Sequence, residues 1–369
     1  MSHQETAGED VCAFVAAKRF HQSLCFPSAT VQKTIRVTFA IAGCQEPGTP
    51  TVLFAGGLYG GRWNALWIDH LCQQKRVRVV IPDRPGLGGS TPVALTQRIP
   101  VWLEMVPVLL QHLEVETVTL VAHSSGVIYL FNTLYHLPQV VAAPAPTVYL
   151  ISPWVHPSKS GAKLLTIFSA MPAGLVSGWN KMTSFLVNRL MPSSAPTSKE
   201  KSHPKKHAKG ADVAGSDSLA DGATLFETCG LTPATKQPTR DYFVKMFFEE
   251  DTSGVAEEAK LGLKTNGTQV SWGVCDDYEE FAGKLAQNVA KDARLSSLRV
   301  AAYFGDKDGY VGKGGVQYFR KVWETSASVI FAEIYEIPRM NHDDLALPEH
   351  GVLGRIFDVA SGDDGGKKV

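Results

Sequence analysis

The sequence has no excess of charge of either sign. Its 369 residues include 36 lysines and arginines and 36 aspartates and glutamates, so the formal net charge is +0. A protein that binds DNA or RNA normally carries a basic excess that matches the phosphate backbone. We therefore expect no nucleic-acid partner. We interpret the basic run 201–209 as a solvated loop, with a nuclear signal or a patch for an anionic surface as the alternatives.

Paired cysteines and long apolar runs are also lacking. The six cysteines are scattered, none forms a CxxC pair, and none belongs to a cluster with metal-ligand spacing. This pattern is typical of a reducing compartment and indicates neither a disulfide framework nor a zinc site. No apolar run reaches the ~18 residues that span a bilayer, and the first residues show no signal-peptide pattern. We expect a cytoplasmic protein with no transmembrane segment.

Short apolar runs alternate with segments of helical periodicity, and this order predicts a mostly parallel sheet with helices on both faces. The expected strands are 31–42, 51–55, 77–82, 117–122, 147–152, 298–304 and 328–337. The expected helices are 62–74, 98–113, 126–136, 314–324 and 345–360. Pro107 lies inside one of these helices and predicts a kink or a break there.

The alternation stops between residues 154 and 296, where helical segments and a polar tract replace the buried strands. We therefore predict one α/β core in two pieces, 29–153 and 297–369, with a mainly helical insertion, 154–296, between them. Within the insertion, residues 193–222 are rich in small and polar residues and have few large apolar ones. Such a tract cannot bury enough surface to offset its ordering entropy, so we expect a disordered loop.

The first 28 residues are expected to form a helical extension. Residues 9–26 have the pattern of an amphipathic helix, and Pro27 would end it. The predicted core would then begin at residue 29.

One pentapeptide has the context of a nucleophile elbow. Ala122-His123-Ser124-Ser125-Gly126 directly follows an expected buried strand and opens an expected helix. This is the setting in which G-x-S-x-G places a serine on a tight turn, here with Ala122 in place of the first glycine. Small residues are needed at both ends of the pentapeptide because larger ones would clash with the adjacent strand and helix. The turn would aim the helix N-terminus, and its backbone N–H groups, at a developing oxyanion.

Four further segments support this interpretation, each at or after the end of an expected strand. They are Gly56–Gly60, Pro82–Ser90, Gly305–Val311 and Pro338–Asp344. In their motifs and their order, these segments and the elbow resemble the α/β-hydrolase superfamily over nearly all of the chain outside the insertion. The resemblance implies an α/β fold of that type, with a mostly parallel central sheet, flanking helices and a helical cap insertion.

The resemblance assigns a catalytic triad to Ser124, His342 and Asp308, with Asp306 as the second choice for the acid. The order Ser, Asp, His along the chain is that of α/β-hydrolases. A serine hydroxyl is a poor nucleophile near neutral pH, so a base must take its proton, and histidine can accept and return it. The carboxylate would hold the histidine tautomer and stabilise the imidazolium. This chemistry needs no metal and no organic cofactor.

The resemblance also assigns an oxyanion hole. The superfamily carries an H-G-x-x-G loop after a strand, and this chain has Gly56 in place of the histidine, so the support of the loop is expected to differ. Leu58 would donate the first backbone N–H and Ser125 the second. The segment Pro82–Ser90 would shape the floor of the site and have a structural role.

The apolar composition of the insertion indicates the kind of substrate that the site would accept. Residues 161–192 are strongly apolar, and we interpret them as the core of a cap over an apolar pocket. A lid that transiently contacts lipid surfaces and a plain pair of core helices are the alternatives. Trp154 and His156 are expected at the rim of the pocket, and Tyr59 and His123 are further candidates for substrate contact.

These observations favour a serine hydrolase that cleaves an ester, thioester or related acyl bond of an apolar small molecule through an acyl-enzyme. An acyltransferase or a tailoring hydrolase of secondary metabolism would use the same triad, and the sequence does not separate them. Epoxide hydrolases and dehalogenases of the superfamily use an aspartate nucleophile, where this chain has Ser124. A non-catalytic ligand-binding protein is the alternative from another class, against which the intact triad argues.

Overall fold

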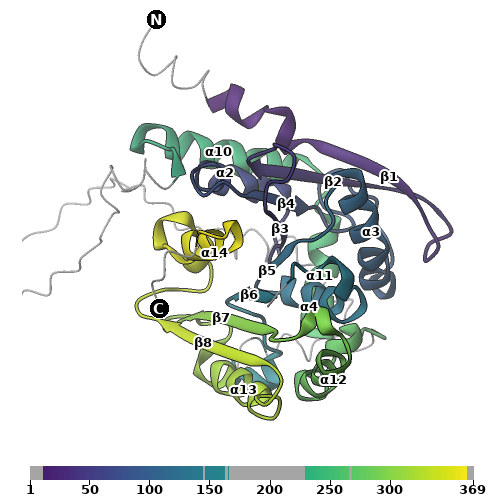
Figure 1. The fold of residues 1–369 in the computed structure, drawn as a ribbon. Helices are drawn as coiled ribbons and strands as arrows, with labels where there is room; N and C mark the ends of the chain where they lie inside the picture. Colours follow the sequence, from purple (N-terminus) through teal and green to yellow (C-terminus); the bar gives the residue numbers. More distant parts are fainter. Residues whose placement is uncertain (1–10, 144–145, 163–164, 166–228, 266–267, 364–369) are drawn as a thin grey trace, which may run out of the picture.

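Eight strands form one sheet at the centre of the structure (Figure 1). The computed structural model describes residues 11–143, 146–162, 165, 229–265 and 268–363. The strands are β1 (Gln22–Ser28), β2 (Lys33–Gly43), β3 (Thr51–Ala55), β4 (Arg78–Pro82), β5 (Thr119–His123), β6 (Thr147–Ile151), β7 (Arg299–Gly305) and β8 (Phe331–Ile337). Their order in the sheet is β1-β2-β4-β3-β5-β6-β7-β8. The pairs β1–β2 and β2–β4 are antiparallel, and the other five are parallel, which confirms the expected mostly parallel sheet.

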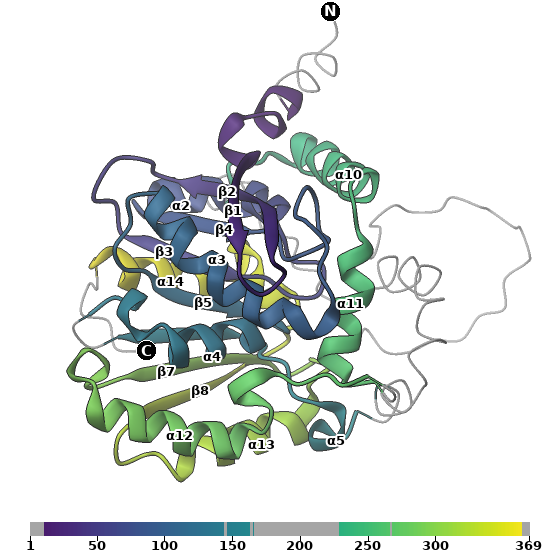
Figure 2. The same cartoon turned by 90° about the vertical axis from the view of Figure 1, so that its right-hand side faces the viewer.

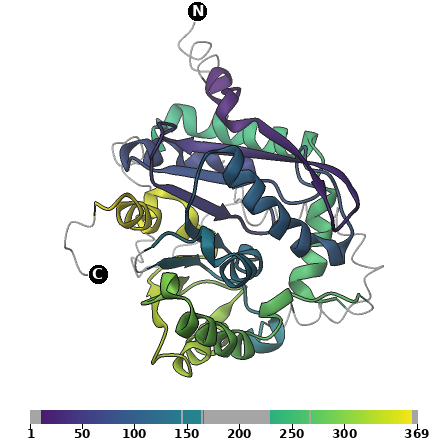
Figure 3. The ribbon, with the colours of Figure 1, turned by 45° about the vertical axis from the view of Figure 1, so that its right-hand side comes forward.

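Helices cover both faces of this sheet (Figure 1 and Figure 3). One face packs against α2 (Ala65–Gln74) and α14 (Val352–Ser361). The other packs against α3 (Arg98–His112), α4 (Gly126–His136), α12 (Tyr278–Lys291) and α13 (Gly312–Glu324). Every residue of β3 and β4 is therefore buried, as expected for parallel strands between two helical layers.

Short 3₁₀ helices connect many of these elements. They are Lys18–Phe20, Arg62–Asn64, Leu95–Gln97, Pro138–Val140, Gly273–Cys275, Ala293–Leu295, Asp344–Ala346 and Pro348–His350. The helix expected over 345–360 is thus two 3₁₀ turns followed by α14. Helix α3 continues through Pro107 and does not break there, because its buried apolar face packs against the core and outweighs one lost backbone hydrogen bond.

The expected N-terminal helical extension is wrong for its second half. Residues 11–15 are helical, but residues 22–28 form β1, the edge strand that pairs with β2. Exposed and buried residues alternate along it, with Leu24 and Phe26 turned into the core. This period of two marks a half-buried strand. Pro27 is tolerated because an edge strand needs only one side of its backbone for pairing.

The chain between β6 and β7 is mainly helical in its described residues. It contains α5 (Pro157–Ser160), α10 (Pro233–Glu249), α11 (Ser253–Leu263) and α12. Helices α10 and α11 run along one side of the molecule, from the β1–β2 end toward α5 (Figure 2). Helix α12 instead belongs to the layer that covers the sheet, since the Phe281 ring lies 4.5 Å from that of Phe131 on α4.

Several predicted features lie outside the described residues. These are the tract 193–222, the basic run 201–209 and most of the apolar stretch 161–192. Among the helices of the described part of the chain, none has both the length and the apolar character needed to cross a bilayer.

Candidate active site

Ser124 occupies a strained turn between β5 and α4. Its φ angle is 50°, in the left-handed region that residues other than glycine rarely adopt. The turn is held by a hydrogen bond of 2.9 Å from the Ser124 N–H to the carbonyl of Ile151 on the next strand. A β-carbon at Gly126 would lie 2.0 Å from the carbonyl oxygen of Ala55, so the turn requires glycine there. The pentapeptide therefore has the geometry of a nucleophile elbow.

Ser124, His342 and Asp308 meet at the carboxyl end of the sheet. His342 Nε2 lies 2.7 Å from Ser124 Oγ, and His342 Nδ1 lies 2.7 Å from Asp308 Oδ2. All three residues are buried, with exposed fractions of 8%, 6% and 5% for Ser124, His342 and Asp308. Ser124 follows β5, Asp308 follows β7 and His342 follows β8, so the fold brings together residues distant in sequence.

The Asp308 carboxylate is oriented by the backbone of its own loop. Its Oδ1 accepts hydrogen bonds from the N–H groups of Tyr310, at 2.8 Å, and Val311, at 3.0 Å. Its Oδ2 is therefore left to face the imidazole. Burial alone would raise the pKa of Asp308, but the adjacent His342 and these hydrogen bonds hold it below its usual value. Asp306, the second choice for the acid, instead accepts the Arg339 N–H at 2.6 Å.

His342 is held on three sides by groups that fix its ring and backbone. Burial would lower its pKa, but the charge and hydrogen bond of Asp308 outweigh burial and raise it. The Ser152 hydroxyl donates to the His342 carbonyl at 2.8 Å, and the Tyr310 ring packs edge-on at 5.1 Å between centroids. Sequence reasoning missed Ser152 and Tyr310. The available signal was their position beside the carboxyl ends of buried strands, where sites of α/β proteins form.

The loop with the first predicted oxyanion donor lies directly against Ser124. A β-carbon at Gly57 would be 3.1 Å from Ser124 Cβ and 3.0 Å from His123 Nδ1. The Gly60 N–H donates to the Gly57 carbonyl at 2.8 Å and closes a tight turn. Leu58 follows Gly57 in this turn. Ser125, the second predicted donor, is the N-cap residue of α4, where backbone N–H groups have no partner within the helix.

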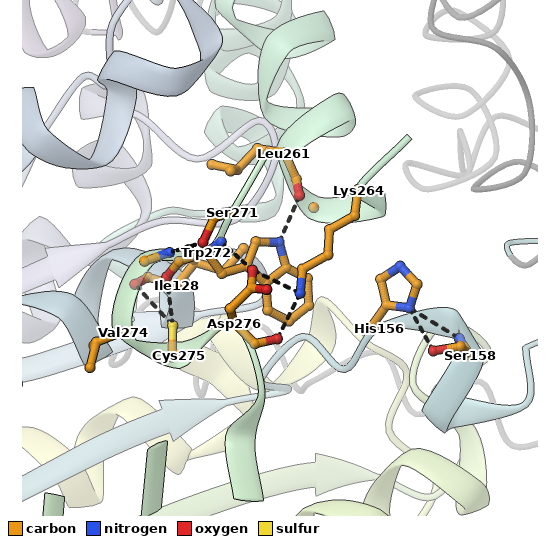
Figure 4. Close-up of polar contacts among 12 residues, drawn as sticks. Ile128, His156, Ser158, Leu261, Lys264, Ser271, Trp272, Val274, Cys275 and Asp276 are labelled. Carbon is orange, nitrogen blue, oxygen red and sulfur yellow. Dashed lines mark hydrogen bonds and ion pairs between the residues drawn. The ribbon is translucent and has the colours of Figure 1, made fainter. Parts of the chain in front are cut away.

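Two of the four predicted substrate contacts use their polar atoms to hold the structure together. The Trp154 indole N–H donates to the Gly262 carbonyl at 2.8 Å, at the end of α11. The His156 ring contacts Ser158, as Figure 4 shows, and its Nε2 lies 3.0 Å from the Leu263 carbonyl.

The other two lie closer to Ser124 and His342. The His123 ring centroid is 5.4 Å from that of His342, and burial lowers the pKa of His123 to about 4, so its ring is neutral at pH 7. The Tyr59 ring packs against Phe247 of α10, with 6.0 Å between centroids. Both residues border the triad or its loop.

Three potential metal ligands also gather here. Atoms of His123, His342 and Asp343 lie within 4.8 Å of one another, the only such group of three among the described residues. However, both ring nitrogens of His342 are already engaged, one by Asp308 and one by Ser124. A metal ion at this position would have to displace one of those two hydrogen bonds.

The sequence matches no protein-family model and no curated protein. Solved structures do resemble it. Epoxide hydrolase A from Mycobacterium thermoresistibile superposes with a TM-score of 0.54 at 15% identity, covering 92% of this chain and 97% of that chain. A structure from a study of carboxylesterases of Nitrososphaera gargenis, an ammonia-oxidizing thaumarchaeon, also superposes on this chain. Its TM-score is 0.51 at 12% identity, with coverage of 93% and 100%.

The chain has the α/β-hydrolase fold. At identities of 12% and 15%, this similarity establishes the fold of the chain but not its substrate. The chemistry must therefore be argued from its own residues. A strained serine, a histidine in hydrogen-bond contact with it and a carboxylate behind the histidine can together activate a hydroxyl for attack on a carbonyl carbon.

Proposed function

We propose that the protein is a serine hydrolase that cleaves an ester, thioester or related acyl bond through an acyl-enzyme. The observation that carries this proposal is the pair of 2.7 Å contacts that link Ser124 Oγ to His342 and His342 to Asp308. The first distance allows direct proton transfer from the hydroxyl. The second fixes the imidazole so that its free lone pair faces that hydroxyl.

In the proposed reaction, Ser124 Oγ attacks the substrate carbonyl while His342 Nε2 takes the hydroxyl proton. The N–H groups of Leu58 and Ser125 stabilise the oxyanion of the tetrahedral intermediate. The intermediate collapses when His342 returns the proton to the leaving alcohol or thiol, and the acyl group stays on Ser124. A water molecule, deprotonated by His342, then attacks the acyl-enzyme. The bond to Ser124 Oγ breaks, His342 returns the proton to that oxygen, and the carboxylic acid leaves.

The charges at the site suit these reaction steps. The lowered pKa of Asp308 keeps the carboxylate ionised at pH 7. The raised pKa of His342 makes its neutral ring a stronger base toward Ser124, and the same carboxylate stabilises the imidazolium that forms.

We further propose that the substrate is an apolar small molecule that binds beside α10. The aromatic pair Tyr59 and Phe247 supports this, because it joins the oxyanion loop to α10 with apolar surface.

The test is covalent labelling with a fluorophosphonate probe, together with hydrolysis of p-nitrophenyl esters from acetate to palmitate. Wild type is expected to label and to hydrolyse at least one ester. Ser124→Ala should lose labelling and about 10⁴ or more in kcat. The matched control is Ser326→Ala, which removes another buried hydroxyl, one that donates to the Ala282 carbonyl away from the triad. It should label and turn over as wild type does.

Each outcome discriminates between functions. Labelling that persists in Ser124→Ala would refute Ser124 as the nucleophile. A wild type that labels but hydrolyses no ester would favour transfer of the acyl group to an acceptor other than water. A wild type that neither labels nor hydrolyses would overturn the proposal and favour a non-catalytic ligand-binding protein.

A further inference from the structure

The oxyanion loop is supported from behind by a buried arginine. Arg84 follows β4, and its side chain is only 1% exposed. Its Nη1 donates to the Gly56 carbonyl at 2.8 Å, and its Nη2 donates to the Gly57 carbonyl. The same Nη2 lies 3.4 Å from the carbonyl of Leu58. One guanidinium therefore contacts three successive carbonyls, in the loop where this chain has glycine instead of the histidine of H-G-x-x-G.

These contacts bear on the orientation of the predicted oxyanion donor. A peptide unit is planar and trans, so the carbonyl of Gly57 and the N–H of Leu58 point in opposite directions within one rigid plane. A hydrogen bond from Arg84 to that carbonyl thus fixes the direction of the Leu58 N–H. A charged donor on the carbonyl also polarises the peptide and strengthens its N–H as a donor.

Arg84 is itself held in place by Glu258, which belongs to α11. The two side chains form an ion pair at 3.3 Å, and each is 1% exposed. Glu258 also accepts from Arg98 Nε, at 2.8 Å, and from the Tyr129 hydroxyl. The Tyr129 ring lies 5.2 Å from the Arg84 guanidinium. Burial would raise the pKa of Glu258, but the two arginines outweigh burial and lower it, so the carboxylate stays charged.

Helix α11 is anchored at both ends. At its start, the Gly254 N–H donates to the Gly86 carbonyl at 2.7 Å. At its end, the Trp272 indole N–H donates to the Leu261 carbonyl at 2.7 Å, as Figure 4 shows. Lys264 covers the same indole ring at 4.3 Å and pairs with Asp276 at 2.9 Å. The position of Glu258 is therefore set by the docking of α11.

We propose that Arg84 is a positioning residue that orients the Gly57–Leu58 peptide for oxyanion binding, and that Glu258 makes this orientation depend on the docking of α11. The inference rests on the proposed function, because an oxyanion hole has meaning only if Ser124 forms a tetrahedral intermediate. It assigns to one arginine the support of the loop in which Gly56 replaces histidine.

The chain offers a matched control for the test. Arg84 and Arg98 both pair with Glu258, but within the described part of the chain Arg98 forms no hydrogen bond with the oxyanion loop. Arg84→Met and Arg98→Met each remove one guanidinium from the same buried carboxylate. For each full-length variant we would measure kcat and KM on one p-nitrophenyl ester, the Ki of a boronic acid that forms a tetrahedral adduct, and the melting temperature.

Arg84→Met is expected to lower kcat by about 10²–10³, the usual effect of losing one oxyanion donor, with KM within about threefold of wild type. The boronic acid should bind less tightly by a factor that approaches the loss in kcat. Arg98→Met should lower the melting temperature to a similar extent and kcat by less than about tenfold. Arg84→Lys should fall between wild type and Arg84→Met, because a single ammonium does not reproduce the planar fork.

Equal losses of kcat in the two Met variants, measured well below both melting temperatures, would overturn the inference. So would an effect of Arg84→Met on KM alone. If Arg84→Met does not fold, Arg84→Lys carries the same test, and an unchanged kcat in that variant counts against the inference. A wild type that neither labels with the fluorophosphonate nor hydrolyses an ester would refute the proposed function and this inference together. An active wild type with unaffected Arg84 variants would refute only the inference.

Discussion

Replacement of Asp308 by asparagine tests the triad through the tautomer of His342. Asp308 Oδ1 accepts two backbone N–H groups, from Tyr310 and Val311. In Asp308→Asn the amide oxygen should keep this position, because a flipped amide would set its NH₂ against two donors. The NH₂ must then face His342 Nδ1 and donate to it. The imidazole proton would move to Nε2, which could no longer accept the proton of Ser124.

The expected loss is large and specific. A histidine held in the wrong tautomer costs triad enzymes about 10⁴ in kcat, equivalent to about 5.5 kcal/mol of transition-state stabilisation. The volume of the side chain and its hydrogen bonds to the loop are retained, so the melting temperature should change little. The assay is kcat on a p-nitrophenyl ester, with the melting temperature measured on the same preparation.

The control is Asp306→Asn, two residues away. Asp306 is exposed and accepts the backbone N–H of Arg339, which an amide oxygen can also accept. Its kcat should stay within about threefold of wild type. A loss of less than tenfold in Asp308→Asn, or an equal loss in both variants, would refute the proposed role of the carboxylate.

The remaining predictions concern pH, stability and packing. Because the folded pKa of His342 is raised, its ring stays protonated to higher pH, so kcat/KM should rise with pH through a midpoint above 6.5, and a midpoint below that value would contradict the assignment. Glu258→Gln should lower the free energy of unfolding by about 3–5 kcal/mol at pH 7, because it breaks a buried ion pair. Because the pKa of Glu258 is lowered on folding, its charge stabilises the folded protein above the unfolded pKa of 4.5, and this stability is lost as the pH falls through the folded pKa. In urea unfolding, the difference in free energy of unfolding between wild type and Glu258→Gln should therefore become smaller in acid. Gly57→Ala places a methyl group 3.1 Å from Ser124 Cβ and should lower kcat at least tenfold with a small change in melting temperature. An unchanged kcat would show that the loop shifts to accommodate the methyl group, and would contradict this prediction.

Much of the fold and the turn at Ser124 could be predicted from local patterns, whereas Asp308 and His342 were assigned by the resemblance to the superfamily. Buried strands that alternate with helices predicted the parallel part of the sheet, and the small residues around Ser124 predicted a turn that the positive φ angle bears out. Such signals are local because a tight turn or a buried strand restricts the residues within it. They are weakest at edges of the sheet. Residues 22–28 alternate in burial as an edge strand does, yet the preceding helical pattern led to the wrong prediction there.

The choice between two carboxylates needed the tertiary structure. Asp306 and Asp308 lie in the same Gly-rich turn, and both are compatible with a strand end. Only in the folded chain do the Tyr310 and Val311 N–H groups turn the Asp308 carboxylate toward His342. The resemblance favoured Asp308, but the reason lies in the backbone of the loop and in the neighbouring strand that brings the histidine.

The sequence by itself determined the parallel α/β arrangement and the turn of the elbow, because each depends on residue types over a few positions or on their periodicity. The order of the candidate triad came from the resemblance to the α/β-hydrolase superfamily. Only the tertiary structure decided which buried charges meet. Arg98 and Glu258 are 160 positions apart, and Arg84 received no more than a structural role from its turn motif. A buried charge finds its partner through packing and desolvation across the whole chain, so no local pattern predicts the pairing.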